Sequence, residues 1–353
     1  MTMTTPELDA PLRGPSLARP KLPLWSFIVI AIIAIGLSGA LFGVGAIHGY
    51  AAFAVVAALL YIVVQTIVSS SVEGWRHGKD RLMTSVLIVS VVLALLPLLA
   101  ILIYTIAAGL KRFDGEFFGH SMRAVAETDP NGGAYNAIIG TLEQVGIATI
   151  IAVPFGIMVA IYLVEYSSGR LGRVVSFFVD VMTGLPSIVA GLFIYAVWIL
   201  ALGQSFSGFA GSLALLILML PTIVRSTEEM LKLVPTALRE ASFALGVPKW
   251  KTVARIVLPT ALPGIITGVM LAISRVMGET APVLLTVFGN PAINNNPFSG
   301  AQASLPLFVF TEVGASSDNA VNRAWAGALT LILIVLLLNI VARTVARFTR
   351  VSA

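Results

Sequence analysis

The stretch LREASFALGVPKWKTVARIVLP, residues Leu238 to Pro259, is a polar and basic segment between some of the most apolar runs of the chain. Its first half predicts a short helix with small residues on one side, and Gly246 suits the positive-φ position that ends such a helix. Pro248 favours the first turn of a second helix, from Trp250 to Val257. The stretch therefore predicts a rigid helical hairpin, with Pro259 and Pro263 marking the entry to the next apolar run.

The composition of the whole chain is that of a membrane protein. Of the 353 residues, 58% are hydrophobic and 11% are charged, and this balance excludes an ordinary soluble domain. The net charge of +5 is explained by membrane topology, so no nucleic-acid partner is expected. The chain has no cysteine, and His48, His77 and His120 lack metal-ligand spacing. Neither a thiolate nucleophile nor a metal site is therefore expected.

Apolar runs predict the fold class: all-α, a polytopic membrane protein with about eight transmembrane helices that contact membrane lipid. At about 1.5 Å per residue, each run spans a hydrocarbon layer of roughly 30 Å, and the alternation typical of barrel strands is missing. The first run is longer than the core of a signal peptide, so an uncleaved helix is expected. The runs cover residues 24–47, 50–68, 83–110, 138–164, 175–203, 208–227, 262–288 and 325–347.

Lysine and arginine are concentrated in alternate loops, which orients the chain by the positive-inside rule. With a cytoplasmic N-terminus, most basic residues lie inside, including those of the hairpin. The basic residues that fall outside are Lys111, Arg112, Arg123 and Arg323. We therefore expect cytoplasmic N- and C-termini. Residues 1–23 are Pro-rich and polar and are expected to form a disordered cytoplasmic N-terminus.

The hairpin has a specific internal register. Glu240, Ala241 and Ser242 precede Gly246 by a fixed spacing, and after nine further residues the register continues with Ile256, Leu258 and Pro259. This register resembles the EAA coupling loop of ABC-importer permeases, with Ser242 at the position of the second alanine. The resemblance implies docking to a separate ATPase. A membrane-surface connector explains the basic residues of the hairpin but not this register.

The chain contains no G-x-x-x-x-G-K-[ST] loop that would hold ATP phosphates. We therefore expect no cofactor and no enzymatic activity in this chain, with ATP and Mg²⁺ on the partner ATPase.

Further segments narrow the resemblance. PFGIMVAIYLVEY (154–166), GLPSIVAG (184–191), LPTIVRSTEEML (220–231) and SRVMGETAPVLL (274–285), with NPF at 296–298 and SLPL at 304–307, are similar to the phosphate-importer permeases of the PstA family. The similarity runs from about residue 80 to the C-terminus. It implies a phosphate path and the plasma (inner) membrane of a prokaryote. It also implies a PstC-like permease, a PstB-like ATPase dimer and a PstS-like phosphate-binding protein as partners.

This resemblance gives a domain plan. Residues 81–353 are expected to form the six-helix permease domain of a type I ABC importer, with a cytoplasmic coupling loop at 228–260 and an outer cap at 289–323. Residues 24–80 are expected to add two transmembrane helices and a loop, for which the family supplies no role.

Charged residues within the apolar runs predict an anion path. Arg275 lies about 18 Å beyond Pro263 along a helix, near the middle of the bilayer, and Glu279 one turn later is placed to pair with it. Such groups usually mark a substrate path, although a structural ion pair is the alternative. The planar fork of Arg suits phosphate oxygens, and a nearby carboxylate keeps the site weak enough to release its cargo.

Two further residues are candidates for the path. Arg225 follows Pro221 by one turn, and snorkelling toward the headgroups competes with a role in the path; the resemblance favours the path. Gly184 and Pro186 interrupt an apolar run and either kink it for packing or expose the backbone to a cavity. Ser187 is the hydroxyl expected there.

Two other functions are alternatives. An ABC permease for sulfate or molybdate is the nearer alternative, because Arg recognition does not by itself fix the oxyanion. A secondary transporter driven by an ion gradient is the more distant one, and it would not need the cytoplasmic hairpin.

Overall fold

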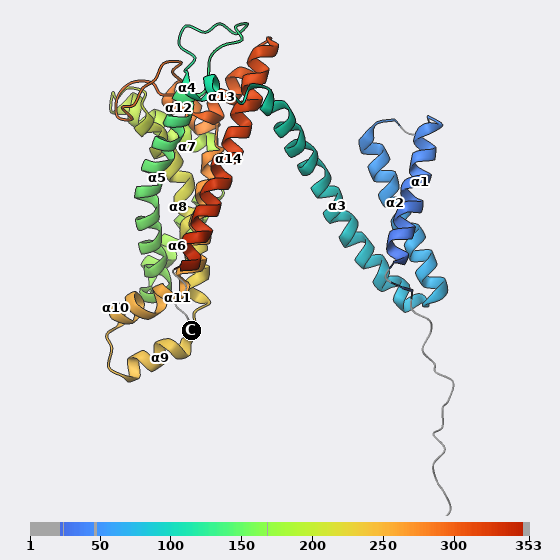
Figure 1. Cartoon of the computed structure of the whole chain (residues 1–353). Helices are drawn as coiled ribbons and strands as arrows, with labels where there is room; N and C mark the ends of the chain where they lie inside the picture. The colour runs from blue at the N-terminus through green and yellow to red at the C-terminus, as the bar shows by residue number, and fades with distance from the viewer. Residues whose placement is uncertain (1–21, 24, 46–47, 168, 349–353) are drawn as a thin grey trace, which may run out of the picture. The chain divides into compact units, whose positions relative to one another are not determined.

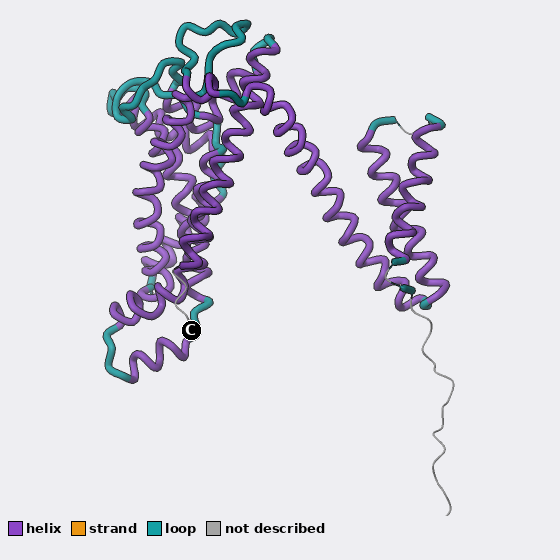
Figure 2. Tube along the Cα trace, in the orientation of Figure 1, coloured by secondary structure: helices purple, strands orange, loops and turns teal. Residues whose placement is uncertain are grey.

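The computed structural model describes residues 22–23, 25–45, 48–167 and 169–348 (Figure 1). These ranges are mostly helical and contain no β-strand, as Figure 2 shows. Seven helices are long and apolar enough to cross a membrane, or up to eight if one bent pair counts as a single span. The prediction of an all-α polytopic membrane protein is confirmed. The N-terminal segment expected to be disordered lies outside the described residues, except for Leu22 and Pro23.

The chain divides into two compact units, residues 1–103 and 104–353. In the first unit, α1 (Ser26–Gly43) and α2 (Tyr50–Val72) pack together. The third helix, α3 (Trp75–Gly109), begins in this unit and ends in the second. The expected domain boundary at 80/81 stays a prediction.

A buried carboxylate organises the connection between α2 and α3. Glu73 accepts hydrogen bonds from the backbone N–H of Leu22 at 2.8 Å, from Ser69 Oγ at 2.7 Å and from Arg81 Nη2 at 3.2 Å. Burial alone would raise the pKa of Glu73, but the hydrogen bonds from Arg81, Ser69 and Leu22 outweigh it and lower the pKa to about 2. One ionised side chain thus joins the N-terminal segment, α2 and α3 where α2 ends.

The second unit is built around α8 (Gly208–Lys232), the most buried of its long helices. Small residues allow close helix contacts: a Cβ added to Gly156 of α5 would lie 2.7 Å from Ile223 of α8, and one added to Gly268 of α11 would lie 2.4 Å from Ser226. The other helices of this unit are α4 (Gly115–Gly119), α5 (Tyr135–Ile161), α6 (Arg170–Thr183), α7 (Ser187–Ile194), α9 (Thr236–Ala244), α10 (Lys249–Thr252), α11 (Leu258–Met277), α12 (Ala281–Val287), α13 (Leu305–Val313) and α14 (Asp318–Phe348).

Two of the predicted runs are broken. The run 175–203 contains α6 and α7, which are bent by 106° relative to each other, far more than a packing kink. The cause is local, because Pro186 has no N–H to donate and disfavours a helical conformation at Leu185. The run 262–288 is interrupted between α11 and α12, at residues 278–280.

The segment 289–323 begins with a series of asparagine turns, before α13 and the first residues of α14. Asn290, Asn294 and Asn296 each accept a hydrogen bond from a backbone N–H two residues later, which is the Asx-turn pattern. Gln302 is buried and bonds to Gln144 of α5 at 2.9 Å. This segment is therefore held against the helices of the second unit.

Candidate functional site

The hairpin predicted for residues 238–259 is present. α9 ends at Ala244, and Gly246 follows with φ +74°, the left-handed conformation expected of it. Pro248 is the N-cap of α10. The local signals of the sequence therefore determine this hairpin.

The register residues do not share one face. Glu240 and Ala241 are exposed, whereas Ser242 is buried at 3% exposure, and its Oγ lies 2.8 Å from Thr252 Oγ1 of α10. The hydroxyl of Ser242 therefore bonds to the other helix of the hairpin, and the role expected of Ser242 in docking stays a prediction.

The junction between hairpin and membrane helix is continuous. Leu258 donates its N–H to the carbonyl of Val253, five residues back, and residues 253–257 form a π-helical turn. This wider turn precedes Pro259, which cannot donate to the helix ladder. Ile256, Leu258 and Pro259 are half-buried there. Pro259 and Pro263 thus lie inside one helical span, from Lys249 to Met277, rather than at a break.

Arg239 fixes the hairpin to the rest of the second unit. Its Nη1 donates to the carbonyl of Val234 at 2.6 Å and its Nη2 to that of Leu231 at 2.9 Å. Its Nε lies 3.0 Å from Glu165 Oε1, in the π-helical turn 162–166 that follows α5. This pair is not evident from the sequence, because 74 residues separate its members.

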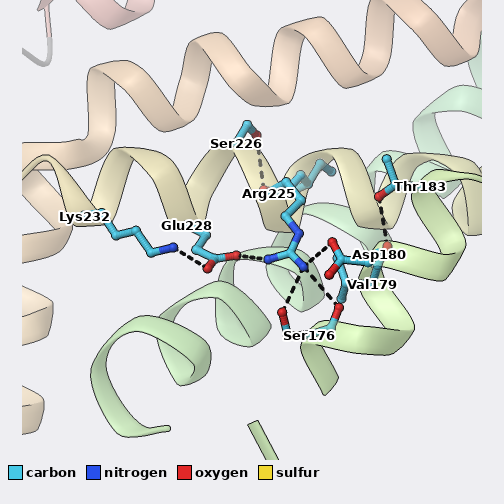
Figure 3. Close-up of polar contacts among 9 residues, drawn as sticks. Ser176, Val179, Asp180, Thr183, Arg225, Ser226, Glu228 and Lys232 are labelled. Carbon is cyan, nitrogen blue, oxygen red and sulfur yellow. Dashed lines mark hydrogen bonds and ion pairs between the residues drawn. The ribbon is translucent and has the colours of Figure 1, made fainter. Parts of the chain in front are cut away.

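Arg225 lies at the centre of a charge cluster, as Figure 3 shows. Its guanidinium donates to Asp180 Oδ1 and Glu228 Oε2, both at 2.5 Å, and to Ser176 Oγ at 2.9 Å. Glu228 also accepts from Lys232 Nζ at 2.6 Å. The charges of two cations and two carboxylates therefore cancel within the cluster. Snorkelling toward the headgroups does not by itself account for these contacts of Arg225.

Glu228 is a member of this cluster that was not predicted from the sequence. Its signal was available, because Arg225, Glu228 and Lys232 follow a spacing of three and then four residues along one helix. Asp180 comes from α6, and only the tertiary structure brings it to Arg225.

Arg275 and Glu279 do not form the expected pair. Among the described residues no ion pair joins them, and Arg275 is exposed in the last turn of α11. The physical reason is that α11 ends at Met277, so Glu279 lies in the turn before α12 and the helical spacing no longer applies.

Ser187 is the first residue of α7, directly after the bend, and is half-buried. The first backbone N–H groups of a helix have no partner within it, so this position presents donors. No group of three or more metal-ligating side chains occurs among the described residues.

Comparison with known proteins gives the family. Residues 152–351 match the family described as "Binding-protein-dependent transport system inner membrane component". In fold, the chain resembles an inward-facing structure of the MetNI methionine ABC transporter, with a TM-score of 0.52 and 22% identity over 61% of this chain and 95% of that chain.

Relatives cover most of the chain. It is 50% identical to the "Phosphate transport system permease protein PstA 1" of Mycobacterium tuberculosis (strain CDC 1551 / Oshkosh), over 76% of this chain and 88% of the relative. It is 49% identical to PstA of Mycobacterium leprae (strain TN), over 78% and 91%. It is 39% identical to PstA of Yersinia pestis, over 77% and 92%. The chain therefore belongs to the PstA family of phosphate transport system permease proteins, within the binding-protein-dependent inner-membrane transport components.

Proposed function

We propose that this chain is the transmembrane permease subunit of an ATP-driven importer of inorganic phosphate. The observation that carries the proposal is the hairpin: a rigid polar knob, with Glu240 and Ala241 exposed, on a chain that has no phosphate-binding loop of its own. Family membership supports the cargo, because the relatives are named phosphate transport permeases.

The remaining subunits follow from this role. A separate PstB-like ATPase dimer holds ATP and Mg²⁺ and receives the hairpin. A PstC-like permease completes the membrane path, and a PstS-like protein delivers phosphate to the outer cap at 289–323. The chain lies in the plasma (inner) membrane of a prokaryote with both termini in the cytoplasm, as the distribution of basic residues favours.

Arg225 is one of the phosphate contacts proposed for the path. Its two carboxylate partners differ in exposure: the side chain of Asp180 is 65% exposed and that of Glu228 is 12% exposed. Phosphate arriving at Arg225 therefore competes with Asp180, while Glu228 stays bound between Arg225 and Lys232. The retained carboxylate weakens the hold on phosphate, which favours release.

Arg275, Glu279 and Ser187 are the other contacts proposed for the path. Arg275 is exposed in the subunit, so its guanidinium is available to an oxyanion where a second permease closes the path. Glu279 tempers the local positive charge. Ser187 and the N-terminus of α7 offer donors to an anion.

Transport then proceeds by alternating access. Closure of the ATPase subunits on ATP moves the hairpin, and the helices around α8 open outward and accept phosphate. Hydrolysis lets the hairpin return, and the path opens to the cytoplasm.

Phosphate uptake by proteoliposomes containing the reconstituted complex tests this proposal. Uptake should require ATP and the ATPase subunit, and sulfate or molybdate should compete poorly. Uptake driven by a proton gradient without the ATPase would overturn the energy source. Preferential uptake of sulfate or molybdate would overturn the cargo.

A further inference from the structure

We propose that Arg239 and Glu165 form the joint that makes the hairpin move as one body with α5 and α8. Glu240 and its neighbours contact the driving subunit, whereas Arg239 lies behind them and positions the hairpin. The inference rests on the proposed function, and it names a part of the transmission that the coupling register does not contain.

The joint lies at the short connection between α8 and α9. Only residues 233–235 connect α8 to α9, and the last regular helical bond before α9 runs from the N–H of Leu233 to the carbonyl of Glu229, so the backbone alone holds this corner weakly. At this corner the carbonyl of Leu231 accepts only one backbone hydrogen bond among the described residues, from the N–H of Val234 at 3.3 Å, and Val234 itself lies beyond the end of α8, where carbonyls lack helical partners. Arg239 donates to both carbonyls. One guanidinium therefore stiffens the corner between α8 and the hairpin.

The same guanidinium reaches a helix that is distant in the sequence. Glu165 belongs to the π-helical turn after α5, and its Oε1 lies 3.0 Å from Arg239 Nε and 2.9 Å from Nη2. A second contact follows next to it: Lys249 Nζ of α10 lies 5.1 Å from the ring centre of Tyr166. Both helices of the hairpin, α9 through Arg239 and α10 through Lys249, thus contact the end of α5.

Burial makes the ion pair effective as a joint. The side chain of Arg239 is 15% exposed and that of Glu165 only 6%, so water replaces their contact poorly. Charge-assisted bonds with fork geometry fix both distance and direction. A lysine at 239 would keep the charge and lose the simultaneous contacts with two carbonyls and a carboxylate.

The test uses the complete complex in proteoliposomes and measures two rates, phosphate uptake and ATP hydrolysis. Arg239→Gln should lower the phosphate transported per ATP at least about tenfold, because it leaves the buried Glu165 without its cation and loosens the corner. Hydrolysis and ATPase assembly should persist, because the exposed Glu240 and Ala241 are unchanged. Arg239→Lys should give a ratio of phosphate to ATP between those of the wild type and Arg239→Gln. Arg173→Gln is the matched control, an exposed arginine of α6 outside the described ion pairs, and should retain the wild-type ratio.

A cross-link separates positioning from folding. The chain has no cysteine, so Glu165→Cys with Arg239→Cys gives the subunit a single thiol pair. A bifunctional thiol reagent should restore phosphate transported per ATP, and reduction of a cleavable reagent should abolish it again. A wild-type ratio in Arg239→Gln, or no recovery after cross-linking, would overturn the joint. If the wild-type complex itself shows no ATP-dependent phosphate uptake, the proposed function fails instead.

Discussion

Ser242 of α9 and Thr252 of α10 lie with their hydroxyl oxygens 2.8 Å apart, both side chains being buried. This bond joins the two helices of the hairpin near its turn. A serine at this register position therefore stabilises the hairpin from within.

Ser242→Ala should lower the stability of the hairpin by about 1 kcal/mol, because it removes one buried hydrogen bond while Thr252 keeps a weak contact to the Pro248 carbonyl at 3.4 Å. Thr252→Val should have a similar effect, and the double variant should cost less than the sum. Thermal unfolding of the purified subunit in detergent measures the cycle. Strict additivity would mean that the hydroxyl pair contributes nothing.

Gly246 should be required for its backbone and not for its size. A Cβ there would meet nothing within 4 Å, but φ is +74°, so Gly246→Ala should cost about 1–2 kcal/mol. Gly246→Asn should cost less, because Asn adopts the left-handed region more readily. Co-purification of the ATPase and phosphate uptake should therefore decline more in the Gly246→Ala variant than in the Gly246→Asn variant. The reverse order would show that bulk at the docking surface decides.

The local parts of the hairpin were predictable because their signals are adjacent in the sequence: Gly246 ends one helix and Pro248 begins the next. The orientation of Ser242 was not, because it depends on how α9 and α10 rotate against each other. Helical spacing alone predicted the wrong partner for Arg275, because the helix ends before Glu279. Both differences have one cause: a sequence pattern describes a single helix and not how that helix ends or packs against its neighbours.

The charge cluster shows the same limit over a longer distance. Arg225 and Lys232 flank Glu228 on one helix, and the sequence contained that spacing. Asp180, 45 residues from Arg225, and Glu165, 74 residues from Arg239, come into contact only when α5, α6 and α8 have packed. Residues that join elements are therefore the part of the site that a single sequence hides.

Asp180→Asn should weaken the interaction between residue 180 and Arg225, which competes with phosphate, without unfolding the subunit. The exposed ion pair contributes at most about 1 kcal/mol, so thermal unfolding should change little. The half-saturating phosphate concentration for uptake should fall, and the maximal rate should fall too, because release slows. Glu228→Gln is the comparison, and it should destabilise the subunit more because this side chain is 12% exposed and holds two cations. An unchanged phosphate dependence in Asp180→Asn would contradict the competition.

Glu73 should make the first unit sensitive to acid. Its folded pKa is about 2 and its ordinary value is 4.5, so folding favours the ionised form. The resulting stabilisation is complete above pH 4.5 and is lost as the pH falls toward 2. Thermal unfolding of the wild type should therefore weaken across this window, and Glu73→Gln should show a shallower dependence. Parallel curves would place the acid sensitivity elsewhere.

Arg275→Ala should abolish phosphate uptake while the complex still assembles. Because Arg275 is exposed and joins no described ion pair, its loss should leave the stability of the subunit within about 0.5 kcal/mol. Arg275→Lys keeps the charge but not the fork, so partial uptake is expected. Glu279→Gln should tighten phosphate binding, because it removes the carboxylate that tempers the site. Undiminished uptake in Arg275→Ala would remove this arginine from the path, and Arg225 would then be the principal cationic contact for phosphate.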